Sequence, residues 1–366
     1  GAMYVIPPFS RLLVLDATTG EQLWSFDPEP ALDHRETGAG GLASRGVAYW
    51  ESGDKKRIFL PVRDGRLYSI DIETRRPDPN FGYKGKIDLR AGLPHDGSFL
   101  FLSSPPALFE NVLLQPIGIN DEPSAPATAV PLRAFDAETG RPLWSFHTAP
   151  QPGEFGSETW GDDSNLDRGG CNAWSAISVD AQRGIFYVPT GAPNNDKFGG
   201  DRPGDNLFAN CILALDARSG QRLWHFQTVR HDLWDYDMPA MPNLVDLTVN
   251  GETVPCVAVA GKTGFVYVFN RVTGEPIFPI EDRPVPASDI PGERASPTQP
   301  FPTKPPAFAG QRLTAETLSR LDPETAAALA KELASYRNEG LFTPPSRQGT
   351  VVYPGQLGGA NWSGAA

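Results

Sequence analysis

Residues 212–224 read ILALDARSGQRLW, and this stretch decides the fold because the chain repeats it. LRAFDAETGRPLW at 132–144 and LLVLDATTGEQLW at 12–24 are close copies, and LYSIDIET at 67–74 and VYVFNRVTG at 266–274 are weaker ones. Successive Asp or Asn positions of the copies lie 55, 65, 80 and 54 residues apart. These distances are somewhat longer than the roughly 40 to 50 residues of a minimal four-stranded propeller blade.

Each copy predicts a β-hairpin. A short apolar run forms one strand, the Asp can bond its own backbone in the turn, and the Gly supplies a positive φ. The Trp of the following strand can then pack between sheets. A four-stranded sheet cannot bury both faces alone, and radial stacking of such sheets solves this problem. We therefore predict an all-β fold, a β-propeller of four-stranded antiparallel blades; a flat sandwich array is the alternative.

Composition limits the function classes. The 366 residues carry 32 Lys and Arg against 44 Asp and Glu, a formal net charge of −12, which argues against a nucleic-acid or anionic-membrane surface. No stretch approaches the roughly 18 to 20 apolar residues of a membrane span. Cys171, Cys211 and Cys256 have no metal-binding or disulfide spacing. Gly1–Met3 resembles the scar of a cleaved tag, so we expect a single domain at 4–366.

One region interrupts the β pattern, and we expect an extended and helical insertion at about 283–340. Residues 283–309 are Pro-rich, and residues 314–338 predict two short helices. Asp322 is the expected N-cap of the second helix, with Pro323 at its first position. A surface excursion packed on the propeller is favoured over a catalytic lid.

Several longer motifs identify a family. They are HDLWDYDMP at 231–239, GKTG at 261–264, GGLASRGVAY at 40–49, YVPTG at 187–191, FQTV at 226–229, PTQPF at 297–301 and FTPPS at 342–346. Together they resemble the dehydrogenases that depend on pyrroloquinoline quinone (PQQ), particularly the membrane-bound glucose dehydrogenase branch. The resemblance extends from about residue 4 to the last residue.

The resemblance implies an eight-bladed propeller, of which this chain shows five hairpins and the start of a sixth blade at 349–366. We therefore expect a chain truncated at both ends, with unpaired sheet edges that favour self-association or a partner chain. We also expect PQQ binding to be weak or absent unless the ring is completed, because contacts and desolvation are lost on the open side.

For catalysis, the resemblance implies Asp235 as the general base, since oxidation of an alcohol requires loss of its hydroxyl proton. Asp232 and Asp237, in the same loop, are interpreted as turn formers. Lys262 matches the residue that donates to the quinone oxygens, where a cation favours the reduced cofactor. Taken alone, a lysine in GKTG could equally be a solvated turn residue.

The resemblance also implies the residues that hold the cofactor. Arg45 matches an arginine that faces PQQ and suits a carboxylate; a strand-edge ion pair is the alternative. Trp174 matches the tryptophan whose ring lies under the flat cofactor, whereas Trp24, Trp144 and Trp224 are interpreted as core. Three further residues match polar contacts to the cofactor: Ser103, Ser104 and Asn361.

For the metal, the resemblance implies a hard cation held by oxygen ligands beside the quinone. Asp121 matches the carboxylate ligand, Glu122 is beside it, and Thr190 lies near the second ligand loop. The sequence departs from the alcohol-dehydrogenase pattern at Ala192, where those relatives place a ligand Asn, and it lacks their adjacent cysteine pair. Calcium or magnesium is favoured over a lanthanide.

The function implied is a periplasmic quinoprotein dehydrogenase that oxidises an alcohol, polyol or sugar by hydride transfer to PQQ. Electrons would pass to a quinone or a cytochrome, and no nucleic-acid partner is expected. The alternatives are a non-enzymatic propeller scaffold that has lost the cofactor site, or an inactive fragment that needs a partner chain. The enzyme interpretation predicts that Arg45, Asp121, Trp174, Asp235 and Lys262 converge at one end of the propeller axis.

Overall fold

The computed structural model describes residues 1–7, 10–28, 44–93, 100–119, 130–161, 164, 170–318, 322–362 and 364–365. The strands are β1 (Ala2–Val5), β2 (Leu12–Asp16), β3 (Gln22–Phe26), β4 (Ala48–Ser52), β5 (Lys55–Pro61), β6 (Arg66–Asp71), β7 (Arg76–Pro77), β8 (Lys86–Asp88), β9 (Leu100–Phe101), β10 (Ala107–Phe109), β11 (Val112–Gln115), β12 (Gly118–Ile119), β13 (Leu132–Asp136), β14 (Pro142–Phe146), β15 (Ser178–Asp180), β16 (Ile185–Pro189), β17 (Cys211–Asp216), β18 (Arg222–Gln227), β19 (Asn243–Val249), β20 (Glu252–Ala260), β21 (Val266–Asn270), β22 (Ile280–Pro284) and β23 (Thr298–Pro302). The helices are α1 (Ala315–Leu318) and α2 (Pro323–Leu333), with a 3-10 turn at Ser157–Thr159.

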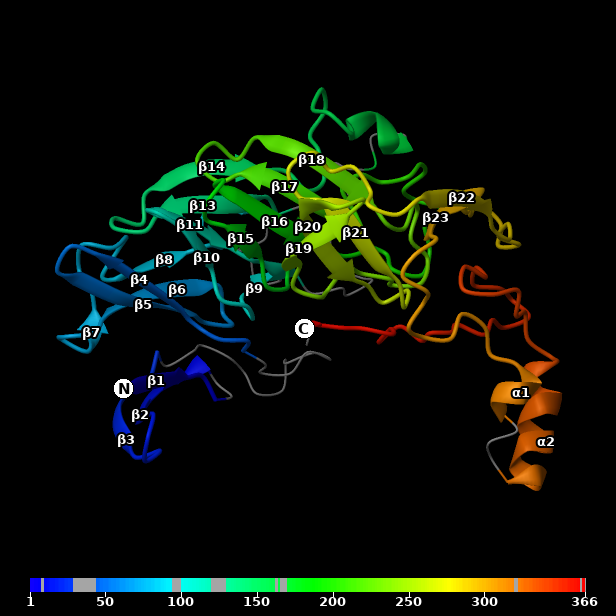
Figure 1. Ribbon diagram of the computed structural model, residues 1–366, viewed down its shortest axis with the longest axis horizontal. Coiled ribbons are helices and arrows are strands. Elements are labelled where there is room, and N and C mark those ends of the chain that lie inside the picture. The colour runs from blue at the N-terminus through cyan, green and yellow to red at the C-terminus, as the bar shows by residue number, and fades with distance from the viewer. Residues whose placement is uncertain are drawn as a thin grey trace.

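The strands form successive antiparallel sheets, each of which contains one copy of the repeat. The strand orders of these sheets are β1-β2-β3, β4-β5-β6-β7 with β8 on β6, β10-β11-β13-β14, β15-β16-β17-β18 and β19-β20-β21. Figure 1 shows these sheets following one another around an arc. The predicted all-β propeller architecture is confirmed, because the sheets are arranged side by side around a common axis and do not form two flat layers.

The repeat turns have one hydrogen bond in common. The N–H of Gly20, Gly140, Gly220 and Gly274 donates to the carbonyl of the Asp or Asn four residues earlier, at 2.8 Å in every case. All four glycines have positive φ. In the weaker copy at Asp71 the donor is Arg75, at 2.8 Å and with φ of 60°. The turn therefore keeps its left-handed residue even where the glycine is absent.

Tryptophans of the repeat join one sheet to the next. Trp144 donates from its indole N–H to the carbonyl of Ala217, and Trp224 does the same to Arg271, both at 3.1 Å. Each acceptor directly follows the Asp or Asn of the next copy. The apolar clusters likewise lie between neighbouring sheets, for example Leu12 and Val14 against Ile58. Burial between adjacent sheets is how the repeat stabilises the fold.

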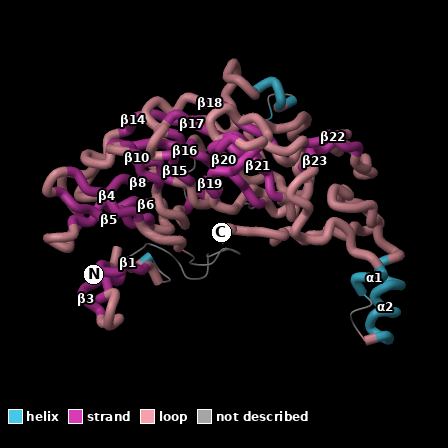
Figure 2. The backbone as a smooth tube through the Cα atoms, viewed as in Figure 1, coloured by secondary structure: helices cyan, strands magenta, loops and turns pink. Residues whose placement is uncertain are grey.

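The first strands of four sheets lie next to one another. Strand β4 contacts β10, β10 contacts β15, and β15 contacts β19. The loops that enter these strands therefore lie near the axis of the propeller. Figure 2 shows loops connecting the strands along the arc, and the C-terminal segment running back beneath the arc toward its centre.

The region after β21 differs in part from the prediction. Asp322 caps α2, with its carboxylate accepting from the N–H of Thr325 at 2.9 Å, as expected. The Pro-rich segment, however, contains parts of the two paired strands β22 and β23, since prolines fit an edge ladder where no N–H is needed. In the described residues of 349–366, where we predicted the start of a sixth blade, there is a single bridge, Arg337 to Thr350, and no paired strand. The sixth blade therefore stays a prediction.

Candidate active site

The predicted cofactor residues precede the first strands of their sheets. Arg45 lies three residues before β4, Ser104 three before β10, and Trp174 four before β15. Lys262 belongs instead to the turn between β20 and β21. The repeat therefore brings residues together that are far apart in the sequence.

Lys262 lies between two carboxylates. Its Nζ donates to Asp235 Oδ1 and to Asp237 Oδ2, both at 2.8 Å. The Lys262 side chain is only 6% exposed, compared with 21% for Asp235 and 11% for Asp237. Asp235 has a φ of 61°, a left-handed conformation that Asp tolerates better than most residues. Backbone strain at this residue is consistent with a positioned functional carboxylate.

The electrostatics of this group follow from its charges. Burial raises the pKa of Asp235 well above its usual range, the Asp237 carboxylate raises it further, and the Lys262 ammonium offsets only part of the effect. Burial alone would lower the pKa of Lys262, but the two carboxylates together raise it above its ordinary value. One ammonium neutralises one carboxylate, so the cluster holds a proton more readily than an isolated Asp does.

A second group forms around Arg45. Its guanidinium donates from Nη1 to Ser103 Oγ at 2.6 Å and lies 4.9 Å from the centre of the Trp174 ring and 4.8 Å from that of Trp362. Ser104 Oγ donates to the carbonyl of Trp174 at 2.8 Å. Arg45 thus makes cation–π contacts with two tryptophans, and in the described part of the chain it has no carboxylate partner. The strand-edge ion pair considered for it is not formed with any of these residues.

Two glycines connect these groups. A Cβ on Gly191 would lie 2.7 Å from Asp237 Oδ1 and 3.3 Å from Trp174 Nε1, so both side chains rest against this one residue. A Cβ on Gly358 would overlap the Lys262 side chain, and a few residues later Trp362 reaches Arg45. Arg45, Trp174, Asp235 and Lys262 therefore converge, while Asp121 lies outside the described residues.

The remaining predicted residues differ in their outcome. Glu122, like Asp121, lies outside the described residues. The Thr190 hydroxyl donates to the carbonyl of Phe208 at 2.6 Å and accepts from the N–H of Cys211 at 2.8 Å, so backbone groups use it. Asn361 bonds locally, to the carbonyl of Leu357 at 2.9 Å and to the N–H of Trp362 at 2.7 Å. Among the described residues no three His, Cys, Asp or Glu side chains form a metal-binding group.

The interpretation of Asp237 as a turn former is wrong. Its Oδ1 accepts from the N–H of Ala192 and its Oδ2 binds Lys262, so it joins two loops of the site. Asp232 does behave as a turn former, accepting from the N–H groups of Trp234 and Tyr236 at 2.8 and 2.7 Å. The role of Asp237 depends on Lys262, 25 residues later in the chain, and the local sequence around Asp237 does not show it.

Two site residues were not singled out in the sequence. Trp362, next to the predicted Asn361, contacts Arg45. Asp196 is half-buried beside the site, where burial and then the Asp237 carboxylate raise its pKa to about 6. The sequence offers no signal for Asp196 beyond its position after YVPTG, because its electrostatic neighbours are distant in the chain.

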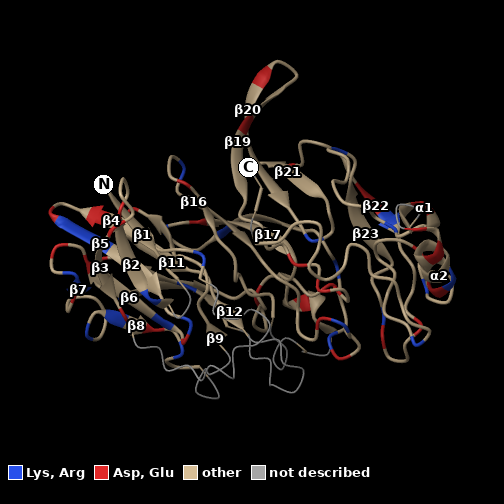
Figure 3. Cartoon of the chain, turned by 90° about the horizontal axis from the view of Figure 1, so that it is seen from below, with Lys and Arg blue, Asp and Glu red and all other residues tan. Residues whose placement is uncertain are grey.

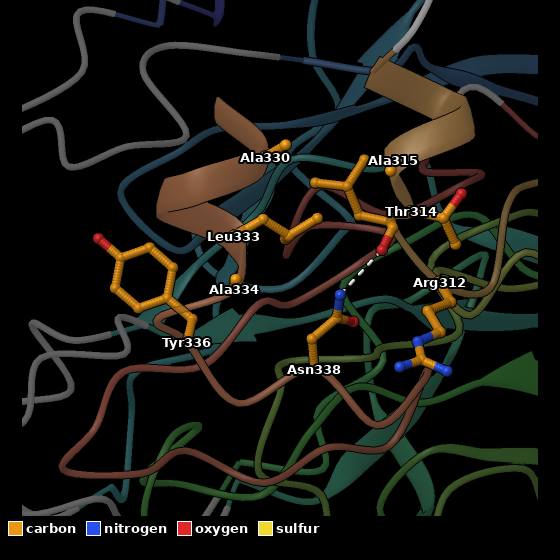
Figure 4. Close-up of a pocket in the computed structure, with 9 residues that line it drawn as sticks. Arg312, Thr314, Ala315, Ala330, Leu333, Ala334, Tyr336 and Asn338 are labelled. Atoms are coloured by element: carbon orange, nitrogen blue, oxygen red, sulfur yellow. Dashed lines mark hydrogen bonds between the residues drawn. The ribbon is translucent and has the colours of Figure 1, made fainter. Parts of the chain in front are cut away.

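One hollow of the structure lies away from these residues. A cavity of about 370 Å³ separates α1 from α2 and is lined by residues that include Leu313, Leu333 and Tyr336, with Asn338 donating to the carbonyl of Leu313 at 2.8 Å (Figure 4). None of the predicted site residues lines it. Figure 3 shows acidic and basic positions interspersed on the loops of the described chain. Among the described residues, no helix is long and apolar enough to cross a bilayer.

Comparison with known proteins identifies the family of the chain. Residues 1–366 match the family described as PQQ, glucose/ethanol/alcohol dehydrogenase β-propeller domain. The chain belongs to this family. It is 35% identical to the quinoprotein glucose dehydrogenase of Escherichia coli strain K12, over 99% of this chain and 46% of that protein. It is 29% identical to the quinate/shikimate dehydrogenase (quinone) of Acinetobacter baylyi, over 100% of this chain and 47% of the relative.

Solved structures agree with this assignment. The quinohemoprotein alcohol dehydrogenase of Pseudomonas putida HK5 superposes with a TM-score of 0.67 at 28% identity, covering 83% of this chain and 43% of that one. That of Comamonas testosteroni gives 0.64 at 25% identity, covering 83% and 44%. The chain spans about half the length of the curated relatives that it matches. This PQQ-type propeller therefore shares the fold of quinoprotein dehydrogenases over most of its length.

Proposed function

We propose that the protein is a quinoprotein dehydrogenase that oxidises the hydroxyl of an alcohol, polyol or sugar. The observation that carries the proposal is the buried Lys262 ammonium within 2.8 Å of both Asp235 and Asp237. Burying a lysine and two aspartates together costs desolvation free energy. A group of this kind is therefore better explained by a function than by stability. A scaffold propeller does not need such a group, and no contact described here favours that alternative.

The residues present fit PQQ, an anionic, flat molecule. Trp174 presents an aromatic ring, and Arg45 has a buried Nε without a hydrogen-bond partner, as has the neighbouring Ser44 hydroxyl. The Arg45 guanidinium lies 4.9 Å from the centre of the Trp174 ring, so a ligand that stacks on this face of the ring would have to displace it. When bound, PQQ supplies an electrophilic quinone carbonyl that takes up hydride.

The protein residues then have separate tasks. Asp235, the more exposed of the two carboxylates, accepts the proton of the substrate hydroxyl. Lys262 holds Asp235 in place, and because an ammonium has three donors, one N–H remains for an oxygen of the cofactor. Asp237 fixes the lysine and connects it to the loop at Ala192. The site thus combines a base with a cationic donor.

A hard cation completes the proposal. Calcium or magnesium would be held by oxygen ligands, with Asp121 and Glu122 as its first candidates. The Thr190 hydroxyl would have to leave its backbone partners to contribute. We further propose a periplasmic location and a quinone or cytochrome as electron acceptor.

The decisive experiment uses purified protein with PQQ and either calcium, magnesium or EDTA. We expect reduction of an artificial electron acceptor with a sugar, a polyol or an alcohol, only when PQQ is present. Tryptophan fluorescence should be quenched during PQQ titration, and light scattering reports whether self-association or a partner is required. A protein that neither binds PQQ nor reduces the acceptor in its native assembly would refute the proposal.

A further inference from the structure

The turn that carries Lys262 has a counterpart elsewhere in the chain. Residues 62–65, between β5 and β6, make the same two hydrogen bonds as residues 261–264, between β20 and β21. The N–H of Gly65 donates to Val62 at 3.0 Å, as that of Gly264 does to Gly261 at 3.0 Å. In the reverse direction Val62 donates to Arg66 at 2.8 Å and Gly261 to Phe265 at 3.1 Å. The backbones of these two turns are therefore equivalent.

The repeat fixes which residues correspond. Asp71 and Asn270 occupy the same position of the repeat, and each lies eight residues after a cation, Arg63 and Lys262 respectively. Both cations follow the last residue of their strand by two positions. Because equivalent turns of the blades of one propeller point to the same end of the axis, Arg63 occupies in its blade the place that Lys262 occupies in the site.

Arg63 differs from Lys262 in its surroundings. The residue is 8% exposed, and its guanidinium lies 4.2 Å from the centre of the Phe101 ring. The nearest carboxylate in the sequence, Asp64, accepts instead from Arg66 Nε at 3.0 and 2.9 Å. Among the described residues, no Asp or Glu forms an ion pair with Arg63.

Arg45 lies close enough to Arg63 for their charges to interact. Phe101, which Arg63 covers, is two residues from Ser103, which Arg45 binds, so the two guanidinium groups lie beside the same short segment. Burial and then the Arg63 charge lower the pKa of Arg45 to about 10. The buried Arg63 and the half-buried Arg45 have no carboxylate partner among the described residues, so the two cations repel each other and lose hydration. A bound anion would offset this cost.

We propose that Arg63 and Arg45 together bind a carboxylate group of a ligand at the axial end of the propeller, beside the Lys262 site. This inference rests on the proposed function for the identity of the ligand. The carboxylate belongs either to the bound cofactor, since PQQ carries three of them, or to an acidic substrate. Arginine suits this task because its planar fork matches a carboxylate.

The test compares Arg63→Gln with Arg347→Gln, an exposed arginine remote from this pair in the sequence. Tryptophan fluorescence is titrated with PQQ and with its neutral trimethyl ester, and KM is measured with quinate and with glucose. Losing a charge-assisted hydrogen bond should weaken the affected affinity by about tenfold or more. A weaker affinity for PQQ but not for its ester assigns the carboxylate to the cofactor, whereas a raised KM for quinate alone assigns it to the substrate.

A third probe separates this inference from the proposed function. Benzene-1,3,5-tricarboxylate should bind the cofactor-free protein and do so about tenfold more weakly in Arg63→Gln. If the protein binds this anion but not PQQ, the proposed function fails and the arginine pair stands. If Arg63→Gln binds all of these carboxylates as tightly as wild type, the proposal that Arg63 and Arg45 bind a carboxylate is wrong.

Thermal unfolding without ligand excludes a purely structural role. Because removing one of two like charges relieves repulsion, Arg63→Gln should melt no lower than wild type. Arg63→Lys keeps the charge and should retain part of the affinity. A melting temperature clearly below that of Arg347→Gln would show that Arg63 stabilises the fold instead, against the proposal.

Discussion

The turns at 62–65 and 261–264 have the same backbone and opposite electrostatic surroundings. Both close with the same pair of hydrogen bonds, and both present a buried cation two residues beyond a strand. Lys262 meets two carboxylates, while Arg63 meets the Phe101 ring and the Arg45 charge. The repeat therefore sets where a side chain lies, and the loops around it set its electrostatic surroundings.

The largest expected difference concerns catalysis. Asp235→Asn removes the base and should lower kcat by about 10² to 10⁴. Residue 235 has a φ of 61°, and Asn tolerates this left-handed conformation as Asp does, so the substitution should leave the backbone of the loop unchanged. Dye reduction by PQQ-loaded protein measures the effect, and Asp54→Asn, at an exposed carboxyl in the turn between β4 and β5, is the control, with a loss below about tenfold expected for a carboxyl outside the chemistry. Equal losses in both variants would place the base elsewhere.

The second prediction concerns stability. Lys262→Met leaves Asp235 and Asp237 buried without their cation, so the free energy of unfolding should fall by about 3 to 5 kcal/mol. Arg63→Met, in the equivalent turn, removes a cation that has no carboxylate partner among the described residues and should cost much less. Urea denaturation of both variants measures the difference. Similar losses at the two turns would mean that the carboxylates contribute little to holding Lys262.

The third prediction concerns pH. Asp235 must be ionised to accept a proton, and its raised pKa means that kcat/KM should increase as the pH rises through the alkaline range. Asp237→Asn removes the like charge, and Lys262 then pairs with Asp235 as the one remaining carboxylate. The pKa of Asp235 should fall, so the increase in kcat/KM should move to lower pH by about one unit. The pH–rate profile of the PQQ-loaded protein tests it. A shift to higher pH would show that Asp237 does not raise the pKa of Asp235.

The smallest effect tests the shared backbone. Gly65 and Gly264 have φ of 89° and 79°, so Ala at either position should cost about 1 kcal/mol of stability. At Gly65 the new Cβ would meet the Arg90 side chain at 2.9 Å, which can move, whereas at Gly264 it would meet Ala309 Cβ at 2.7 Å. Urea denaturation should therefore show a slightly larger loss for Gly264→Ala. The reverse order would indicate that the two turns are less alike than their hydrogen bonds imply.

Much of the site could be predicted because a motif places residues locally. The pairing of Lys262 with Asp235, and of Arg45 with Trp174, was predicted only as convergence at one end of the axis, and the described contacts agree with it. Asp237 was misinterpreted because a carboxylate in a turn has the same sequence signal whether or not a lysine from another blade reaches it. Trp362 was missed because its contact depends on the path of the C-terminal segment across the site.

The sequence by itself determined the repeating hairpin, because an Asp or Asn and a left-handed residue four positions later specify the turn through a bond between near neighbours. It also determined which residue each blade presents two positions after a strand. Only the tertiary structure decided that Lys262 lies between two carboxylates and Arg63 over the Phe101 ring, because those neighbours come from other loops whose approach depends on the packing of whole sheets. Local bonds act over a few residues, whereas charge interactions act across space and are set by the assembled fold.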